Sequence, residues 1–410
     1  MASTQLYHDA SAGNQKTWTF SAWVKRGGLG AVSYLYSQGS AGNNYIGIYF
    51  GSADDFRVYN EVSSNQTLYF RTNRLFRDTA FWYHVVVKCD TTQYTEADRF
   101  KIYINGVQET SFSSASYPAQ NSDTNMNATT RERIGVLHPG SNSPNYYWNG
   151  SMSHVHLTDG NAYDASAFGS TDSTTGEWKI NTSPSVTYGT NGFFILKDGN
   201  SGTDQSGQSN NFSTSGSLTK TEDCPSNVFA VLNPNHQSTF HSTSRATLAN
   251  GNTKWTGSSN NTSQNGILST LGASTGKFYL EAKWKGTYDC LLGVAKDDFG
   301  MMTAGSGGFQ STGWYGMMTN IGNTGGSGMQ WWSNNSATGD RGTALSQNDI
   351  VMMAIDITNS KLYFGKNGTW EESGVPTSGS TGTGATSTLA SNTTYLVGCA
   401  NYGYDVANSW

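Results

Sequence analysis

Thr17-Trp-Thr-Phe-Ser-Ala-Trp-Val24 is the stretch that decides the fold class, because large apolar residues alternate along it with small or polar ones. Every second residue from Trp18 to Val24 is apolar, so an extended chain places these side chains on one face. The paired glycines Gly27-Gly28 follow and predict a turn. The segment therefore predicts a half-buried β-strand that ends in a turn.

The same pattern recurs along the chain, with Asn-Gly pairs at the ends of strands. Phe100-Lys-Ile-Tyr-Ile104 is followed by Asn105-Gly106, and Lys361-Leu-Tyr-Phe364 is followed soon after by Asn367-Gly368. An Asn-Gly pair supplies the two positive-φ positions of a tight hairpin turn. Both halves of the chain are thus predicted to contain antiparallel hairpins.

Composition favours an all-β protein of two domains. The 410 residues are too many for one ordinary domain. Charged residues make up 13%, about half of the roughly 25% of a typical globular protein, but aromatic residues also reach 13%. A disordered polar chain would lack those aromatic residues. We predict two antiparallel jelly-roll-like β-sandwiches, residues 1–197 and 266–410, joined by an irregular connector over residues 198–265.

Charge and hydropathy exclude several classes of function. The net charge is −5 without a basic block, so we expect no nucleic-acid partner. No run approaches 18 apolar residues, so we expect no membrane insertion. The start, Met1-Ala2-Ser3-Thr4-Gln5, lacks the regions of a secretory signal, which predicts synthesis in a host cytoplasm. Four well-separated cysteines are expected to be reduced and mostly buried: Cys89, Cys224, Cys290 and Cys399.

Ordered motifs in the two modules resemble two families of β-sandwich. The first module resembles laminin-G-like, concanavalin A-like modules through Phe20-Ser-Ala-Trp-Val-Lys25, Trp82-Tyr-His-Val-Val-Val87, Lys101-Ile-Tyr-Ile-Asn-Gly106 and Trp148-Asn-Gly-Ser-Met-Ser-His-Val155. The second resembles a SPRY domain through Gly276-Lys-Phe-Tyr-Leu-Glu281, Gly313-Trp-Tyr-Gly316, Asn348-Asp-Ile-Val351 and Leu362-Tyr-Phe-Gly-Lys-Asn-Gly368. A SPRY domain usually continues into a further aromatic-rich strand, whereas this sequence stops at Trp410. An open sheet edge there would invite a neighbouring chain.

A more specific resemblance is to virion proteins of marine bacteriophages. It rests on Thr17-Trp-Thr-Phe-Ser-Ala-Trp-Val-Lys-Arg26, Gly169-Ser-Thr-Asp-Ser-Thr-Thr-Gly-Glu-Trp178, Tyr188-Gly-Thr-Asn-Gly-Phe193 and Pro225-Ser-Asn-Val-Phe-Ala-Val-Leu-Asn-Pro234. In that group such sandwiches serve as fibre, spike or head-decoration parts. The resemblance implies a protein carried on the surface of a virus particle.

The alternative reading is a glycoside hydrolase of the concanavalin A-like fold. That chemistry needs two carboxylates flanking the glycosidic bond, about 5–5.5 Å apart in retaining enzymes. The nearest match to a laminarinase-type Glu-x-Asp-x-x-Glu pattern is Glu96-Ala-Asp-Arg-Phe-Lys101, where Lys101 replaces the last acid. We therefore expect no enzyme and no catalytic residue.

No cofactor is expected, but two metal alternatives stay open. His154 and His156 are two residues apart, so on a strand both imidazoles would share one face and, in a symmetric oligomer, could surround an axial transition metal. The competing interpretation is two polar residues on the solvent-facing side of the strand. Asp54-Asp55 and Asp297-Asp298 read as turn residues, where calcium could bind.

Aromatic residues set among Gly, Asn and Ser are the predicted ligand contacts, because flat rings stack on sugars or pack into a partner. The competing interpretation is that they fill the core of a sandwich. The predicted positions are Trp314, Tyr315, Trp331 and Trp332 in the second module and Tyr146 and Tyr147 in the first.

Together these patterns predict a non-enzymatic bacteriophage virion protein, displayed on the particle as a short appendage, a fibre or spike, or a head decoration. Its loops would bind host-surface glycan or other virion proteins, with several copies in a homo-oligomer supplying avidity. A receptor-binding role and a decoration role both stay open.

Overall fold

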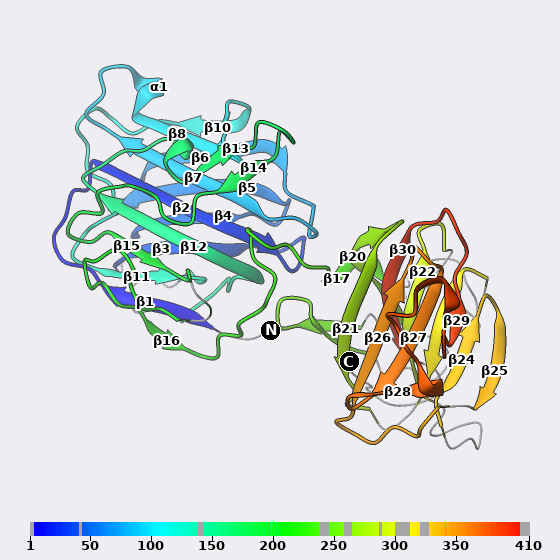
Figure 1. Ribbon diagram of the computed structural model, residues 1–410. Coiled ribbons are helices and arrows are strands. Elements are labelled where there is room, and N and C mark those ends of the chain that lie inside the picture. Colours follow the sequence, from blue (N-terminus) through cyan, green and yellow to red (C-terminus); the bar gives the residue numbers. More distant parts are fainter. Residues whose placement is uncertain are drawn as a thin grey trace. The chain divides into compact units, whose positions relative to one another are not determined.

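The computed structural model describes residues 4–40, 43–137, 143–197, 199, 201–237, 246–257, 265–286, 289–299, 312–319, 328–340 and 342–401. The chain divides into two compact units, Met1–Phe229 and Ala230–Trp410 (Figure 1). Antiparallel sheets build both units, which confirms the predicted all-β fold class. Within the described ranges, no helix is long and apolar enough to span a membrane.

Two sheets enclose the core of the first unit. The eight-stranded sheet has the order β10 (Phe112–Ser116), β6 (Asn65–Leu75), β5 (Asp55–Val62), β4 (Asn44–Phe50), β3 (Ser33–Ser40), β11 (Arg131–Ile134), β1 (Gln5–Asp9) and β16 (Ser213–Ser215). The six-stranded sheet has the order β15 (Phe193–Ile195), β12 (Gly150–Asp159), β2 (Thr17–Arg26), β7 (Tyr83–Asp90), β8 (Phe100–Ile104) and β9 (Val107–Glu109). Alternate residues of both sheets, such as Ile48 and Val85, meet in one apolar cluster.

Strand β2 is buried on both faces, whereas the sequence predicted a half-buried strand. Trp18, Phe20, Ala22 and Val24 lie in the core as predicted. The opposite face is covered by the segment that follows β12, which includes η1 (Ala165–Ala167) and the small sheet of β13 (Gly169–Thr171) and β14 (Trp178–Ile180). Alternation alone predicted one wet face because it does not register a distant segment that folds over the sheet.

The second unit also has two main sheets. The seven-stranded sheet has the order β17 (Leu232–Gln237), β20 (Gly266–Ala273), β30 (Tyr395–Asn401), β22 (Cys290–Lys296), β23 (Trp314–Met318), β24 (Gln330–Ser333) and β25 (Ser336–Asp340). The five-stranded sheet contains β21 (Lys277–Lys283), β26 (Ile350–Asp356), β27 (Lys361–Lys366), β28 (Thr369–Trp370) and β29 (Ser387–Thr388). Shorter elements are α1 (Glu96–Arg99) in the first unit and β18 (Thr247–Ala249), β19 (Lys254–Thr256), η3 (Glu371–Ser373) and η4 (Gly379–Thr381) in the second.

The segment predicted as a connector contributes strands to both units. Strand β16 pairs with β1, and β17 pairs with β20. Asp223 is anchored to the first unit by a buried ion pair with Lys25, whose Nζ lies 2.9 Å from Asp223 Oδ2. The unit boundary therefore falls inside the predicted connector, after Phe229. The predicted open edge near Trp410 lies outside the described residues.

Both Asn-Gly turns form as predicted. Asn105 and Gly106 have φ of 48° and 80° between β8 and β9, while Asn367 and Gly368 have φ of 47° and 89° between β27 and β28. These left-handed values are the ones that a tight hairpin turn requires.

Candidate functional site

Six tyrosines gather on the outer face of the eight-stranded sheet, which is the face turned away from the core. The pairing register puts Tyr34 opposite Tyr49, and Tyr59 opposite Tyr69. The residues between them in sequence, such as Ile48 and Val58, point into the core. We call this set the tyrosine face, and its members are Tyr34, Tyr45, Tyr49, Tyr59, Tyr69 and Tyr146.

The rings of the tyrosine face touch one another in two rows. Tyr34 and Tyr49 stack with centroids 4.4 Å apart and planes 7° apart, and Tyr146 stacks on Tyr34 at 6.2 Å. In the second row Tyr59 lies 5.5 Å from Tyr45 and 5.9 Å from Tyr69. Ring pairs at these separations stabilise one another. The result is a cluster of aromatic rings spread over four strands and one loop, in which Tyr34 is buried.

Glycine at position 47 makes room for the tyrosine face. Gly47 points outward between Tyr45 and Tyr49, and a Cβ atom there would meet Tyr34 Cε1 at 2.5 Å. The Tyr34 ring therefore lies down on the strand, and only 4% of this residue is exposed. Tyr45, Tyr49, Tyr59 and Tyr69 remain half-buried, so each offers part of its ring to solvent.

The phenol groups of Tyr45 and Tyr49 stay neutral at neutral pH. Burial and the neighbouring Tyr49 raise the pKa of Tyr45 to about 12, and burial likewise raises the pKa of Tyr49. A neutral phenol both donates and accepts a hydrogen bond. Ring faces and hydroxyl groups together suit a polyhydroxylated ligand.

Arginine and aspartate border the aromatic rows on β5 and β6. Arg57 holds Asp55 with two hydrogen bonds of 3.0 Å, and Arg71 Nε donates to the same carboxylate. Burial acts to raise the pKa of Asp55, but the two arginines outweigh it and lower that pKa. Tyr59 donates to Glu61 Oε2 at 2.8 Å. These carboxylates are therefore engaged by cations or phenols.

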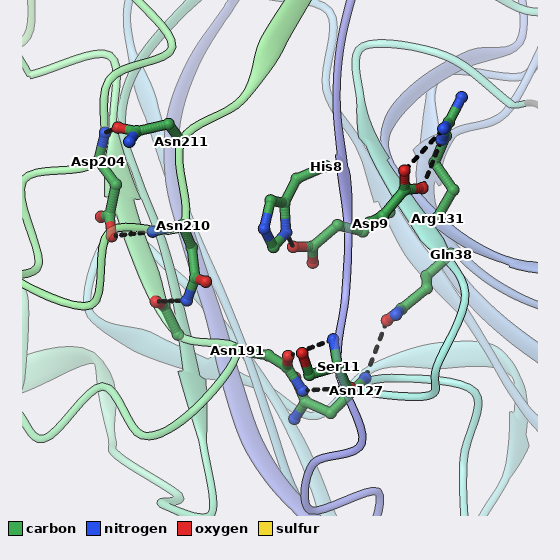
Figure 2. Close-up of polar contacts among 12 residues, drawn as sticks. His8, Asp9, Ser11, Gln38, Asn127, Arg131, Asn191, Asp204, Asn210 and Asn211 are labelled. Atoms are coloured by element: carbon green, nitrogen blue, oxygen red, sulfur yellow. Dashed lines mark hydrogen bonds and ion pairs between the residues drawn. The ribbon is translucent and has the colours of Figure 1, made fainter.

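At the other end of the face, β1 and β11 add Tyr7, Asp9, Arg131 and Arg133, which pair across the two strands. Arg131 lies over the Tyr7 ring, 4.8 Å from its centroid, and it holds Asp9 through bonds of 2.6 and 2.7 Å (Figure 2). Arg133 is 5% exposed, and its one side-chain hydrogen bond within the described part of the chain is a 3.4 Å bond donated to the Arg131 carbonyl. This border thus combines an exposed ion pair with a buried guanidinium.

The structure brings one of the predicted ligand residues of the first module to this face. Tyr146 is 53% exposed and stacks on Tyr34. Tyr147 follows it and is half-buried. The other five tyrosines were missed by sequence reasoning. The Tyr45-x-x-x-Tyr49 spacing, which puts both rings on one strand face, is the signal that could have pointed to them.

In the second unit, three of the four predicted ligand residues are core side chains. Trp314, Tyr315 and Trp331 are exposed by 0%, 4% and 2%. Trp331 stacks on Phe364 at 5.5 Å inside the sandwich. No ring face is available to a sugar at these three positions, so their predicted stacking role lacks support. Trp332 is half-buried and donates to Gln330 Oε1 at 2.9 Å.

His154 and His156 lie in the interior rather than on a solvent-facing side. A bulge between Ser153 and His156 breaks the alternation of β12, and His154 has a φ of 48°. The rings flank Phe194, with centroids 5.5 Å and 4.0 Å from it. Burial and the His154 charge hold the pKa of His156 well below its usual value. Among the described residues, no group of three or more His, Cys, Asp or Glu could hold a metal ion.

The acids considered for hydrolysis or calcium binding are dispersed. Glu96 and Asp98 lie on the exposed turn α1, where Asp98 pairs with Lys101 at 2.8 Å. Asp54 is buried beside Arg26, with Oδ1 2.9 Å from Nη1. Asp297-Asp298 occupies an exposed turn. A two-carboxylate hydrolytic site has no counterpart among these residues.

A serine–histidine pair lies sealed under the covering segment. Ser21 Oγ is 2.9 Å from His84 Nε2, and Trp178 Nε1 donates to His84 Nδ1 at 3.0 Å. Both Ser21 and His84 are 0% exposed, and burial lowers the pKa of His84 to about 3. The pair is packed between Trp23 and Trp178. It therefore holds the covering segment against the sheet and offers no nucleophile to a substrate.

The matched family model covers the region that bears all six tyrosines. Residues 2–166 match the laminin G model of the Concanavalin A-like lectin/glucanases superfamily. The laminin-G-like, concanavalin A-like resemblance of the first module is thus confirmed. The matched residues include β1 to β12 and reach into η1, the first element of the segment that covers β2.

Solved structures with low similarity include β-sandwich and carbohydrate-binding proteins. The SPRY domain of human HERC1 is 13% identical, with a TM-score of 0.29 over 43% of this chain and 94% of that domain. A putative carbohydrate binding protein from Bacteroides ovatus is 14% identical, with a TM-score of 0.36 over 56% of this chain and 60% of its own. A heptameric SAP-like pentraxin from Limulus polyphemus is 15% identical, with a TM-score of 0.29 over 40% and 72%. No curated protein matches the chain.

Proposed function

We propose that the protein is a non-enzymatic surface component of a bacteriophage particle that binds glycan through the tyrosine face. The observation that carries the glycan-binding part is the cluster of tyrosine rings, because its four half-buried rings and the exposed Tyr146 lie on one face of a sheet and suit stacking with sugars. The phenol hydroxyls provide hydrogen-bond partners for sugar hydroxyls. The match to the Concanavalin A-like lectin/glucanases superfamily supports the same assignment.

The carboxylates of the face support binding in preference to hydrolysis. A hydrolase needs one acid that can donate a proton and a second carboxylate across the bond. Asp55 is held ionised by two arginines, and Asp9 is held by Arg131. Glu61 accepts a hydrogen bond from Tyr59. The arrangement favours a ligand that is bound and released unchanged.

Placement on a virus particle is supported by the sequence segments that resemble virion proteins, such as Gly169–Trp178 and Pro225–Pro234. Several copies on one particle would add up weak single-site affinities. Antibody raised against the full chain should label the surface of intact particles in electron micrographs. Labelling confined to lysed host cells would contradict the virion placement.

Glycan binding is tested by removing single rings of the tyrosine face. We expect Tyr49→Ala and Tyr59→Ala each to weaken binding to an immobilised polysaccharide about tenfold, which corresponds to ~1.4 kcal/mol. The matched control is Tyr94→Ala, because Tyr94 is 88% exposed and takes no part in the ring contacts of the face. Biolayer interferometry on the full chain measures the affinities, and circular dichroism verifies the fold. Equal affinity of the unmodified chain and the three variants for the polysaccharide would contradict the proposal.

A further inference from the structure

The outer face of the eight-stranded sheet, which includes the tyrosine face, carries more guanidinium groups than carboxylates, although the whole chain has a net charge of −5. Its arginines are Arg57, Arg71, Arg131 and Arg133, and its carboxylates are Asp9, Asp55 and Glu61. Two of the four guanidinium groups lack a carboxylate of their own, and the Glu61 carboxylate offsets one of them, so one positive charge is left in excess. A positive surface on an acidic protein draws anionic ligands selectively to that surface.

The first source of the excess is the shared carboxylate of Asp55. Arg57 and Arg71 both bind this one group, so the trio keeps one positive charge. Asp55 is 1% exposed, whereas 39% of the Arg71 side chain is exposed. Arg71 engages Asp55 through Nε, so its terminal nitrogens extend beyond that contact. A guanidinium fork of this kind matches the geometry of a carboxylate or sulfate.

The second source is Arg133 on β11, which is paired with Tyr7 of β1 on one side and with Ser37 of β3 on the other. Among the described residues, no carboxylate lies within 4.0 Å of Arg133. The neighbouring Asp9 forms an ion pair with Arg131. Burial and the Arg131 charge lower the pKa of Arg133 to about 10, so it stays protonated at neutral pH. A buried cation that shares its neighbouring carboxylate, Asp9, with Arg131 is only partly compensated, which is costly to the fold. An anion bound at the surface nearby would offset that cost.

We propose that the ligand of the tyrosine face is an acidic polysaccharide. Sugar rings lie on the tyrosines, and carboxylate or sulfate groups contact Arg71 and lie toward Arg133. This assignment rests on the proposed glycan binding and adds the charge of the ligand to it. Tyrosine provides the stacking surface, and arginine selects acidic over neutral chains.

The test compares three polysaccharides with one backbone: dextran, carboxymethyl dextran and dextran sulfate. We expect the full chain to bind at least one acidic derivative about tenfold more tightly than dextran. The preference of the carboxymethyl or the sulfate form identifies the acid group. Arg71→Gln should reduce this preference to about threefold or less, because the exposed guanidinium group that contacts the acid is lost while Arg57 still holds Asp55.

Two controls separate the ligand charge from nonspecific attraction. Lys220→Gln removes one positive charge at an exposed side chain outside the face and should leave the preference unchanged. Tyr49→Ala should weaken binding of the acidic form. Equal affinity for dextran and both acidic forms would overturn the charge assignment and leave glycan binding intact. Failure to bind any of the three would overturn the proposed glycan binding as well. Tight binding of single-stranded poly(dT) or polyglutamate, unaffected by Tyr49→Ala, would overturn the proposal in favour of simple ion attraction.

Discussion

At the scale of single residues, a contact between the half-buried His8 and the buried Glu132 links strand β1 to the core. His8 Nδ1 lies 2.8 Å from Glu132 Oε1, and Tyr36 donates to Glu132 Oε2 at 3.1 Å. The hydrogen bond to Glu132 raises the pKa of His8 against the opposing effect of burial, and burial raises the pKa of Glu132. The first strand of the protein is thus attached through a titratable contact.

The contact predicts a pH-dependent contribution to stability. Because the folded-state pKa of His8 is raised, its contribution is fully present below the unfolded pKa of about 6.5 and is lost as pH rises through the folded pKa. His8→Gln should lower the free energy of unfolding by on the order of 1 kcal/mol at pH 5.5, and by clearly less at pH 9. Urea unfolding followed by tryptophan fluorescence measures both values. A loss of equal size at the two pH values would show that the ion pair contributes nothing.

Burial of single residues also shows where sequence reasoning stops. Trp331 and Trp332 are neighbours, and period-two alternation assigns them to opposite faces of β24. It does not say which face is covered, so the buried Trp331 and the half-buried Trp332 received the same prediction. Tyr146 was found because it stands among polar loop residues, whereas Tyr34 and Tyr59 lie in strands and are brought together only by the pairing register.

At the scale of elements, the two Asn-Gly hairpins offer a matched comparison. Gly106 and Gly368 have similar φ values of 80° and 89°. A Cβ atom on Gly106 would meet Trp178 Cε3 at 2.3 Å, while one on Gly368 would meet nothing within 4 Å. The β8–β9 turn therefore supports the covering segment through Trp178. The β27–β28 turn has no neighbouring side chain at Gly368 to support.

This difference predicts unequal effects of the same substitution. Both Gly106→Ala and Gly368→Ala place a side chain at a left-handed position, which costs roughly 1 kcal/mol. Gly106→Ala should cost about 1–3 kcal/mol more, because the Trp178 ring must move. Chemical denaturation of each variant provides the two losses. Equal losses would mean that Trp178 repacks freely and that the covering segment is only loosely held.

The strands and turns were predictable because they depend on local signals. Alternation from Trp18 to Val24 and the two Asn-Gly pairs each specify an element over a few residues. The covering of this sheet was not predictable, since it depends on contacts between distant parts of the chain, such as Thr19 of β2 with Asn161 and His84 of β7 with Trp178. The connector was likewise read as irregular, yet Ser213–Ser215 pairs with the first strand.

At the scale of the whole molecule, the two units have separate cores and different surfaces. The core of the first unit lies between its two sheets, and Trp255, Trp284 and Trp331 fill that of the second. These three tryptophans thus hold the fold of the second unit together. In the first unit, part of the aromatic side chains are exposed on the tyrosine face, where we propose that the ligand binds.

We propose that the tyrosine face is the surface that binds the ligand. Hydroxyl-radical footprinting of the full chain shows which side chains the ligand covers. Mass spectrometry compares side-chain labelling with and without saturating carboxymethyl dextran. We expect Tyr49 and Tyr59 to be labelled less when the ligand is bound, and the exposed Tyr94 to be labelled equally with and without ligand. Protection of Trp332 in the second unit, with Tyr49 and Tyr59 unchanged, would contradict it.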